Sequence, residues 1–208
     1  MAERTIEDVM ALAPVIPVLT VADVAHAVPL AQALVRGGLP ALEITLRTGA
    51  ALEAIAAISH AVPEAVPGVG TVTTADDLNR ARAAGAQFAV SPGFAADLAA
   101  AAGDLPYLPG IATASEAMAA QRAGLECLKF FPAEAMGGRA TLQALAGPFP
   151  RLTFCPTGGI SRDNAGGYLA LGNVRCVGGS WVAPHDAVEA GAWDVISDLA
   201  AAAARLAG

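Results

Sequence analysis

The junction between a helix and a strand is clearest at residues 36–47, which read RGGLPALEITLR. A basic residue in the last turn of a helix, followed by glycine, is a common signal for the end of that helix. Residues 41–47 then alternate apolar and polar side chains, as a strand does when its two faces meet different surroundings. This stretch therefore predicts one helix-to-strand unit of an α/β protein.

The same junction recurs at residues 82–85 (RAAG) and 122–124 (RAG). Eight short apolar or β-branched runs alternate with alanine-rich helical stretches, at the spacing of strand–helix units. These runs are residues 15–20, 41–47, 66–72, 88–91, 106–111, 127–132, 152–157 and 174–178. Such alternation requires parallel strands, and eight units close most simply as a (βα)8 TIM barrel.

A doubly wound open sheet is the alternative α/β fold. It usually places a glycine-rich phosphate loop after the first strand, and residues 20–23 contain no glycine. No linker or low-complexity segment divides the chain, so we expect residues 1–208 to form a single barrel domain. Residues 3–13 are predicted to form an additional N-terminal helix at the closed end of the barrel.

Charge and composition limit the partners of this chain. It has 12 Lys+Arg, 19 Asp+Glu and a formal net charge of −7, whereas a nucleic-acid surface requires a basic patch. The apolar stretch at residues 9–22 is broken by two prolines and is shorter than the ~20 residues of a membrane span. Three cysteines without paired spacing favour a reduced compartment. We expect a cytoplasmic protein that binds neither nucleic acid nor membrane.

Lys129 is the only lysine, because the other eleven basic residues are arginines. It lies in an otherwise apolar strand, on the face that carries Cys127 and Phe131. Both faces of a barrel strand are covered, and burial disfavours the charged form of an amine. A neutral amine can condense with a ketone to an iminium, an electron sink for breaking a carbon–carbon bond, which arginine cannot do. The simpler interpretations are a lysine that reaches solvent or a buried ion pair.

Glu43, Thr45 and Arg47 share one face of the second predicted strand. A buried carboxylate needs a cationic or protic partner, so Glu43 is a candidate general acid and base. Arg47, nearer the carboxyl end, is a candidate clamp for a substrate carboxylate. A local Glu–Arg or Thr hydrogen-bond network that only stabilises the strand is the alternative.

Glycines close three of the predicted strands, at residues 68–70, 158–159 and 178–179. The first group is followed by Thr71, whose hydroxyl is available to a small acid, and these glycines are expected to let a ligand approach the backbone. Loops after strands seven and eight of such barrels commonly bind phosphate through backbone N–H groups. The two glycine pairs at residues 158–159 and 178–179 therefore predict a phosphate site in these loops. The three histidines match no metal-ligand spacing, so we expect neither a metal nor another cofactor.

Taken in order, these segments resemble the bacterial 2-keto-3-deoxy-6-phosphogluconate (KDPG) and 4-hydroxy-2-oxoglutarate aldolase family. The matching motifs are residues 14–18, 42–48, 68–72, 91–93, 109–111, 129–134, 154–160 and 178–181. The resemblance implies a metal-independent class I aldolase with a (βα)8 fold, usually a homotrimer. Its implied reaction is cleavage of KDPG to pyruvate and glyceraldehyde 3-phosphate in the Entner–Doudoroff pathway.

The same resemblance implies a role for each candidate residue. Lys129 would form the iminium, and Glu43 would act as acid and base. The substrate would contact Arg47 and Thr71 at its carboxylate, Pro92 and Phe131 around the pyruvate, and Thr157 nearby. Its phosphate would bind to Gly158, Gly159, Gly179 and Ser180.

Several other functions remain as alternatives. The substrate could be the galactonate-derived epimer of KDPG or 4-hydroxy-2-oxoglutarate. The chain could instead be a phosphosugar isomerase or epimerase that uses Glu43 as a base, or a phosphosugar-binding barrel without catalysis. An isomerase would explain the glycines but leaves the single lysine without a role.

Overall fold

The computed structural model describes residues 4–206. Every pair of adjacent strands is parallel. The strands are β1 (Val15–Leu19), β2 (Ala41–Thr45), β3 (Val66–Gly70), β4 (Phe88–Val90), β5 (Tyr107–Leu108), β6 (Gly110–Ile111), β7 (Cys127–Phe130), β8 (Thr153–Pro156) and β9 (Val177–Gly179). They form a six-stranded sheet, in the order β5-β4-β3-β2-β1-β9, and a three-stranded sheet, β6-β7-β8.

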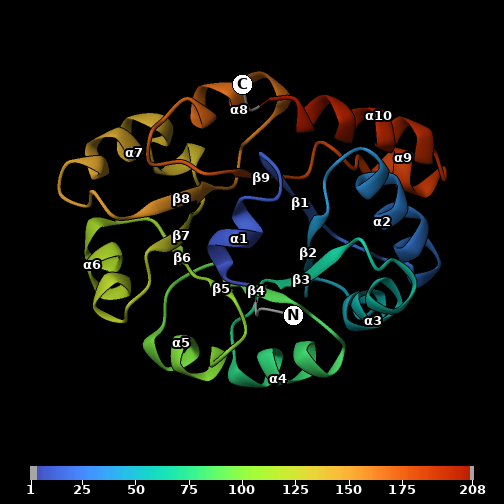
Figure 1. The fold of residues 1–208 in the computed structure, drawn as a ribbon, viewed down its shortest axis with the longest axis horizontal. Coiled ribbons are helices and arrows are strands. Elements are labelled where there is room, and N and C mark those ends of the chain that lie inside the picture. The colour runs from blue at the N-terminus through green and yellow to red at the C-terminus, as the bar shows by residue number, and fades with distance from the viewer. Residues whose placement is uncertain (1–3, 207–208) are drawn as a thin grey trace.

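Helices connect these strands, and α2 to α10 lie around the outside of the two sheets (Figure 1). The α-helices are α1 (Ile6–Met10), α2 (Ala27–Arg36), α3 (Ala51–Ala61), α4 (Ala75–Ala83), α5 (Ala96–Ala102), α6 (Ala114–Arg122), α7 (Gly138–Ala146), α8 (Arg162–Leu169), α9 (His185–Glu189) and α10 (Trp193–Ala204). Two short 3-10 helices, η1 (Val24–His26) and η2 (Glu134–Met136), precede α2 and α7. The predicted α/β alternation with parallel strands is confirmed.

The predicted helix ends are confirmed as well. Helices α2 and α6 end at Arg36 and Arg122, and Arg82 lies in the last turn of α4. A left-handed glycine follows in each case, with φ +91 at Gly38 and at Gly85 and φ +82 at Gly124. Glycine adopts this conformation without the steric penalty of a Cβ, so each helix turns into its strand at that point.

Six of the eight predicted strands end within two residues of the expected bounds, and the other two differ more. The predicted fifth strand, residues 106–111, is divided between β5 and β6 at Pro109, which has no N–H to donate to a sheet ladder. The last strand begins at Val177 instead of residue 174. Val174 forms only an isolated bridge to Phe154, and a second bridge joins Thr157 to Gly178.

Helix α1 is shorter than the predicted helix at residues 3–13 and is capped by a Thr5–Asp8 capping box. Its buried Val9 and Met10 pack against inward-facing side chains of the strands, in a cluster that also contains Cys155 and Cys176. Figure 1 shows α1 in the middle of the view, inside the surrounding helices. Residues 1–3 and 207–208 lie outside the described residues. They include residue 3, the first of the predicted helix, and both ends of the expected domain.

The larger part of the core lies between the strands and the surrounding helices, where Leu42, Ile44, Leu128 and Phe130 are fully buried. The predicted alternation of β2 and β7 is therefore confirmed: these side chains face the helices, and their neighbours in the strands face inward. Across residues 4–206, no helix has the length and apolar character needed to span a membrane.

Candidate active site

Lys129 and Glu43 meet inside the protein. The Lys129 amine donates a hydrogen bond to Oε1 of Glu43 at 3.0 Å and lies 3.4 Å from Oε2. Only 5% of Lys129 and 3% of Glu43 is accessible to solvent. Two ionisable groups that were predicted separately are therefore one buried pair.

Small neighbours make room for this pair. Lys129 lies opposite Gly110 in β6 and Cys155 in β8. On the other side, a Cβ on Gly70 would overlap the Glu43 carboxylate. We expected the strand-three glycines to admit a ligand; the space at Gly70 is instead taken by Glu43, and that at Gly68 by the Phe88 ring.

The pairing adds a partner that the sequence interpretation, based on burial of the amine, did not identify, and it matches the buried ion pair named there as a simpler interpretation. Transfer of a proton across this hydrogen bond, from nitrogen to carboxylate oxygen, would leave a neutral, nucleophilic amine. The arrangement therefore provides a nucleophile and its proton acceptor together.

Thr45 and Arg47, the other polar residues predicted for this face, take no part in the hydrogen bond between Lys129 and Glu43. The buried Thr45 hydroxyl donates to the Leu19 carbonyl at 2.9 Å and lies 3.2 Å from the Thr20 hydroxyl. Arg47 lies beyond the end of β2 and is exposed. Within residues 4–206 the ion-pair partner of Glu43 is Lys129, so the Glu–Arg form of the alternative network is wrong. Its threonine form is present in the hydrogen bonds of Thr45.

A cavity of about 280 Å³ opens at the carboxyl ends of the strands. It contains all four residues of the predicted phosphate site and three of the five predicted substrate contacts. Its lining is Val18, Thr20, Arg47, Phe131, Thr157, Gly158, Gly159, Ile160, Gly178, Gly179 and Ser180. Side chains predicted from four separate strand ends therefore converge on one site.

The lysine adjoins this cavity without lining it. Its Nζ lies 5.4 Å from the centroid of the Phe131 ring, and Phe131 forms part of the cavity wall. The pair thus lies next to a wall residue of the cavity, in surroundings that exclude most water.

Thr71 and Pro92 lie outside the lining of this cavity, at the ends of β3 and β4. Thr71 has φ +63, the only positive φ of a non-glycine residue among residues 4–206. A β-branched residue is strained in this conformation, and such strain is often found at functional sites. The Pro92 side chain is exposed, while its carbonyl packs so closely on Gly110, the neighbour of Lys129, that a Cβ there would overlap it.

The glycines of the predicted phosphate site are required by packing as well as by backbone conformation. Gly158 and Gly159 have φ +96 and +79. A Cβ on Gly158 would lie 3.2 Å from the Phe131 ring, and one on Gly179 would overlap the Trp181 ring. Side chains are thus excluded where backbone N–H groups would have to approach an anion.

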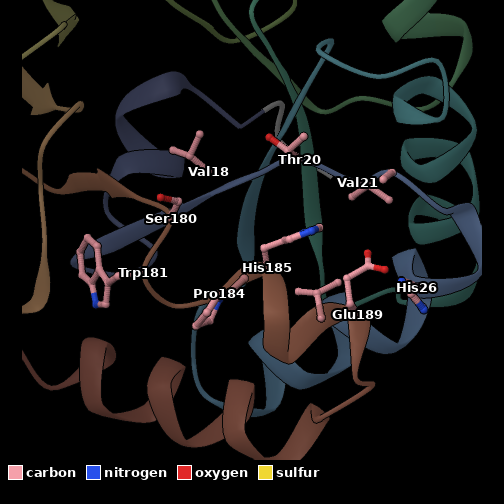
Figure 2. A pocket seen from close by; sticks show the side chains of 12 residues that line it. Val18, Thr20, Val21, His26, Ser180, Trp181, Pro184, His185 and Glu189 are labelled. Atoms are coloured by element: carbon pink, nitrogen blue, oxygen red, sulfur yellow. The ribbon is translucent and has the colours of Figure 1, made fainter.

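A second cavity, of about 520 Å³, adjoins the first and shares Val18, Thr20 and Ser180 with it. Figure 2 shows Val18 of β1 and Thr20 just beyond the end of that strand, with His185 and Glu189 on α9. The sequence analysis missed Val18 and Thr20. Their place at the carboxyl end of the first strand was the available signal, because functional residues of parallel barrels gather at that end.

Neither the histidines nor the cysteines form a metal cluster in the part of the chain that the structure describes. Cys155 and Cys176 are buried and Cys127 is half-buried, all as free thiols, so they pack as small apolar residues. Burial, with smaller contributions from the Glu7 and Glu126 carboxylates, raises the pKa of the Cys127 thiol to about 11.

Comparison with known proteins places this geometry in context. The family model for KDPG and KHG aldolase matches residues 6–199. A 2-dehydro-3-deoxy-phosphogluconate aldolase of Pseudoalteromonas atlantica is 55% identical over 196 residues, which are 93% of this chain and 91% of that protein. The KHG/KDPG aldolase of Escherichia coli K12 is 53% identical, over 93% of this chain and 92% of its own length.

The structural comparison agrees. The KDPG aldolase of Legionella pneumophila, solved with pyruvate captured at low pH as a covalent carbinolamine intermediate, superposes with a TM-score of 0.95. It is 42% identical, and the match covers 97% of this chain and 98% of that protein.

Proposed function

The chain belongs to the KDPG and KHG aldolase family, and we propose that it cleaves KDPG to pyruvate and glyceraldehyde 3-phosphate through a Schiff base on Lys129. The enzyme is then a carbon–carbon lyase of the aldehyde-lyase class. The observation that carries this proposal is the buried Lys129–Glu43 hydrogen bond beside a cavity with two glycine pairs in its wall. The covalent intermediate named for the Legionella protein supports the same chemistry.

The reaction begins when Glu43 accepts a proton from Lys129. The neutral amine attacks the C2 carbonyl of the bound keto acid, and Glu43 returns the proton to the carbinolamine oxygen. Loss of water leaves a protonated iminium. Two groups at 3.0 Å can exchange the proton directly, and the site excludes most water, which favours dehydration.

Cleavage follows from the iminium. Glu43, through a water molecule, takes the proton of the C4 hydroxyl, and the C3–C4 bond breaks as its electrons move into the iminium. Glyceraldehyde 3-phosphate departs, and the enamine that remains is protonated at C3. Hydrolysis of the resulting iminium releases pyruvate and restores Lys129. The iminium itself accepts the electrons, so this mechanism needs no metal ion or other cofactor.

The other candidate residues, in the cavity or at the neighbouring strand ends, position the substrate in this proposal. Arg47 and Thr71 hold the carboxylate, Pro92 and Phe131 enclose the pyruvate carbons, and Thr157 lies beside the carbon chain. The phosphate binds to Gly158, Gly159, Gly179 and Ser180. The convergence of Arg47, Phe131, Thr157 and these four residues on one cavity supports this assignment.

We further propose that residues 1–208 form a single closed (βα)8 barrel with α1 as its extra helix. The bridges Phe154–Val174 and Thr157–Gly178 connect β8 toward β9, and only Pro109 separates β5 from β6. The Lys129–Glu43 hydrogen bond also links the two sheets across the interior. By family resemblance, the enzyme is cytoplasmic, acts on small molecules instead of nucleic acids or membranes, and assembles as a homotrimer.

A retro-aldol assay tests the proposed activity. Purified protein is incubated with KDPG, with its galactonate-derived epimer or with 4-hydroxy-2-oxoglutarate, and pyruvate is detected by a coupled dehydrogenase. KDPG should give the highest kcat/KM. The name of the E. coli relative supports 4-hydroxy-2-oxoglutarate, cleaved to pyruvate and glyoxylate, as a second substrate. Absence of pyruvate with all three would contradict the proposal and favour an isomerase or a binding protein.

A further inference from the structure

The turn between β8 and α8, residues 157–160, is held on the side away from the cavity. Its three successive carbonyls, of residues 157, 158 and 159, accept hydrogen bonds from Ala133 N, Glu134 N and Asn164 Nδ2, at 2.8, 3.1 and 3.0 Å. None of these donors belongs to a residue that lines the cavity. In a trans peptide the N–H points opposite to the carbonyl, so the N–H groups of residues 158–160 are turned away from these donors.

Glu134 holds this turn with its side chain as well as with its backbone. Its Cγ lies against Gly159, where a Cβ would come within 2.6 Å of it. Its carboxylate accepts a hydrogen bond from the hydroxyl of Tyr168. Glu134 itself is exposed, so this hydrogen bond, rather than burial, is what fixes its side chain against the turn.

Tyr168, which donates the hydrogen bond to this carboxylate, is held in place by its packing. It is fully buried in α8 and packs in the same core as Phe130 and Phe154. Burial, together with the hydrogen bond to Glu134 and the charge of that carboxylate, raises the pKa of the phenol. The hydroxyl therefore stays protonated as a donor over the pH range of ordinary assays.

We propose that Glu134 and Tyr168 are positioning residues that set the orientation of the phosphate-binding turn and thereby the affinity for phosphorylated substrate. The pair lies on the carbonyl side of the turn, and the opposite N–H side is the one that an anion would contact. This inference rests on the proposed function, because it assumes that the phosphate of the substrate binds at Gly158 and Gly159.

The test removes the hydroxyl and follows the phosphorylated and phosphate-free ligands separately. Tyr168→Phe should raise KM for KDPG about fivefold to tenfold, as expected for one lost hydrogen bond that acts through the turn, and should change kcat less than about twofold. The pyruvate concentration that gives half-maximal borohydride trapping on Lys129 should stay unchanged, because pyruvate carries no phosphate.

Variants of the partner provide the second arm of the test. Glu134→Gln keeps an oxygen that can accept the Tyr168 hydrogen bond and should raise KM for KDPG less than Glu134→Ala does. Tyr107→Phe is the matched control, because it removes the other tyrosine hydroxyl, which is bound to buried Ser91 at 2.6 Å. It should leave the ratio of KM for KDPG to the half-saturating pyruvate concentration unchanged.

Two results would overturn the inference while the wild-type enzyme cleaves KDPG normally. One is that the ratio of KM for KDPG to the half-saturating pyruvate concentration stays at its wild-type value in Tyr168→Phe and Glu134→Ala. The other is an equal loss of KDPG and pyruvate affinity, which would indicate general damage to the fold. A wild-type protein that traps no pyruvate and cleaves no KDPG would contradict the proposed function itself, and the positioning role with it.

Discussion

The Lys129 amine and the Glu43 carboxylate lie 3.0 Å apart, although 86 positions separate them in the chain and they belong to different sheets. The hydrogen bond crosses the interior of the protein, between β7 and β2. Removing one member of a buried pair leaves the other without a partner, so the two residues depend on each other for stability as well as for chemistry. The predictions below examine each side of this relationship.

Replacement of Lys129 by arginine should abolish cleavage, with a loss of at least ~10³-fold in kcat, because a guanidinium keeps its positive charge and has no neutral amine to attack the ketone. Borohydride added with pyruvate should attach a reduced pyruvate group to the wild-type enzyme at this lysine, detected by peptide mass spectrometry. Borohydride without pyruvate is the control. If the treated enzyme loses activity while Lys129 stays unmodified, the Schiff base on this lysine is refuted.

Glu43→Gln should lower kcat by about 10² to 10⁴-fold, the range for loss of a general acid and base. The amide still accepts a hydrogen bond from Lys129 but cannot take its proton. The half-saturating concentration of pyruvate in slow borohydride trapping should change far less than kcat. If turnover survives, proton transfer belongs to another group.

Gly70→Ala tests whether the position of the carboxylate matters. The added Cβ would overlap the Glu43 carboxylate and push it from Lys129, and a displacement of about 1 Å can lower a rate about 10²-fold. Gly172→Ala is the control, since a Cβ there meets nothing within 4 Å and its φ is not positive. Circular dichroism would verify folding. Equal kcat in both variants would show that Glu43 tolerates displacement.

The raised pKa of the Cys127 thiol should make the free energy of unfolding decrease as the pH becomes alkaline. Its pKa in the folded protein is raised to about 11 from an ordinary value of 9.0, mainly by burial. The unfolded chain therefore loses this proton at lower pH than the folded chain, and the free energy of unfolding decreases as pH rises from 9 toward 11. Urea titrations of wild type and Cys127→Ala should show a smaller decrease in the variant. Equal pH slopes would contradict the prediction.

Much of the local structure could be predicted because its causes are local. The Arg–Gly junctions at Gly38, Gly85 and Gly124 each depend on a few neighbouring residues, and all three proved correct. The alternation in β2 and β7 likewise identified which side chains face inward. The errors arose where a local pattern was modified by its surroundings, as at Pro109, which splits one predicted strand into β5 and β6.

The candidate site was only partly readable for the same reason. A solitary lysine in an apolar strand is visible in the sequence, but its hydrogen-bond partner is not. Gly70 shows the difference plainly: the sequence indicates that something approaches the backbone there, and only the structure shows that it is the Glu43 side chain. The left-handed conformation of Thr71 has no local sequence signal, because a β-branched residue ordinarily avoids it.

The sequence by itself determined the order of helices and strands, the inward placement of Lys129 and Glu43, and the glycines at the strand ends, since each follows from side-chain periodicity or backbone freedom over a few residues. The tertiary structure alone decided that the amine and the carboxylate form a hydrogen bond, and that Glu134 and Tyr168 hold the glycine turn from the side of its carbonyls. Both relationships join segments that are distant in the chain, and the packing of sheets and helices is what brings them within hydrogen-bond distance.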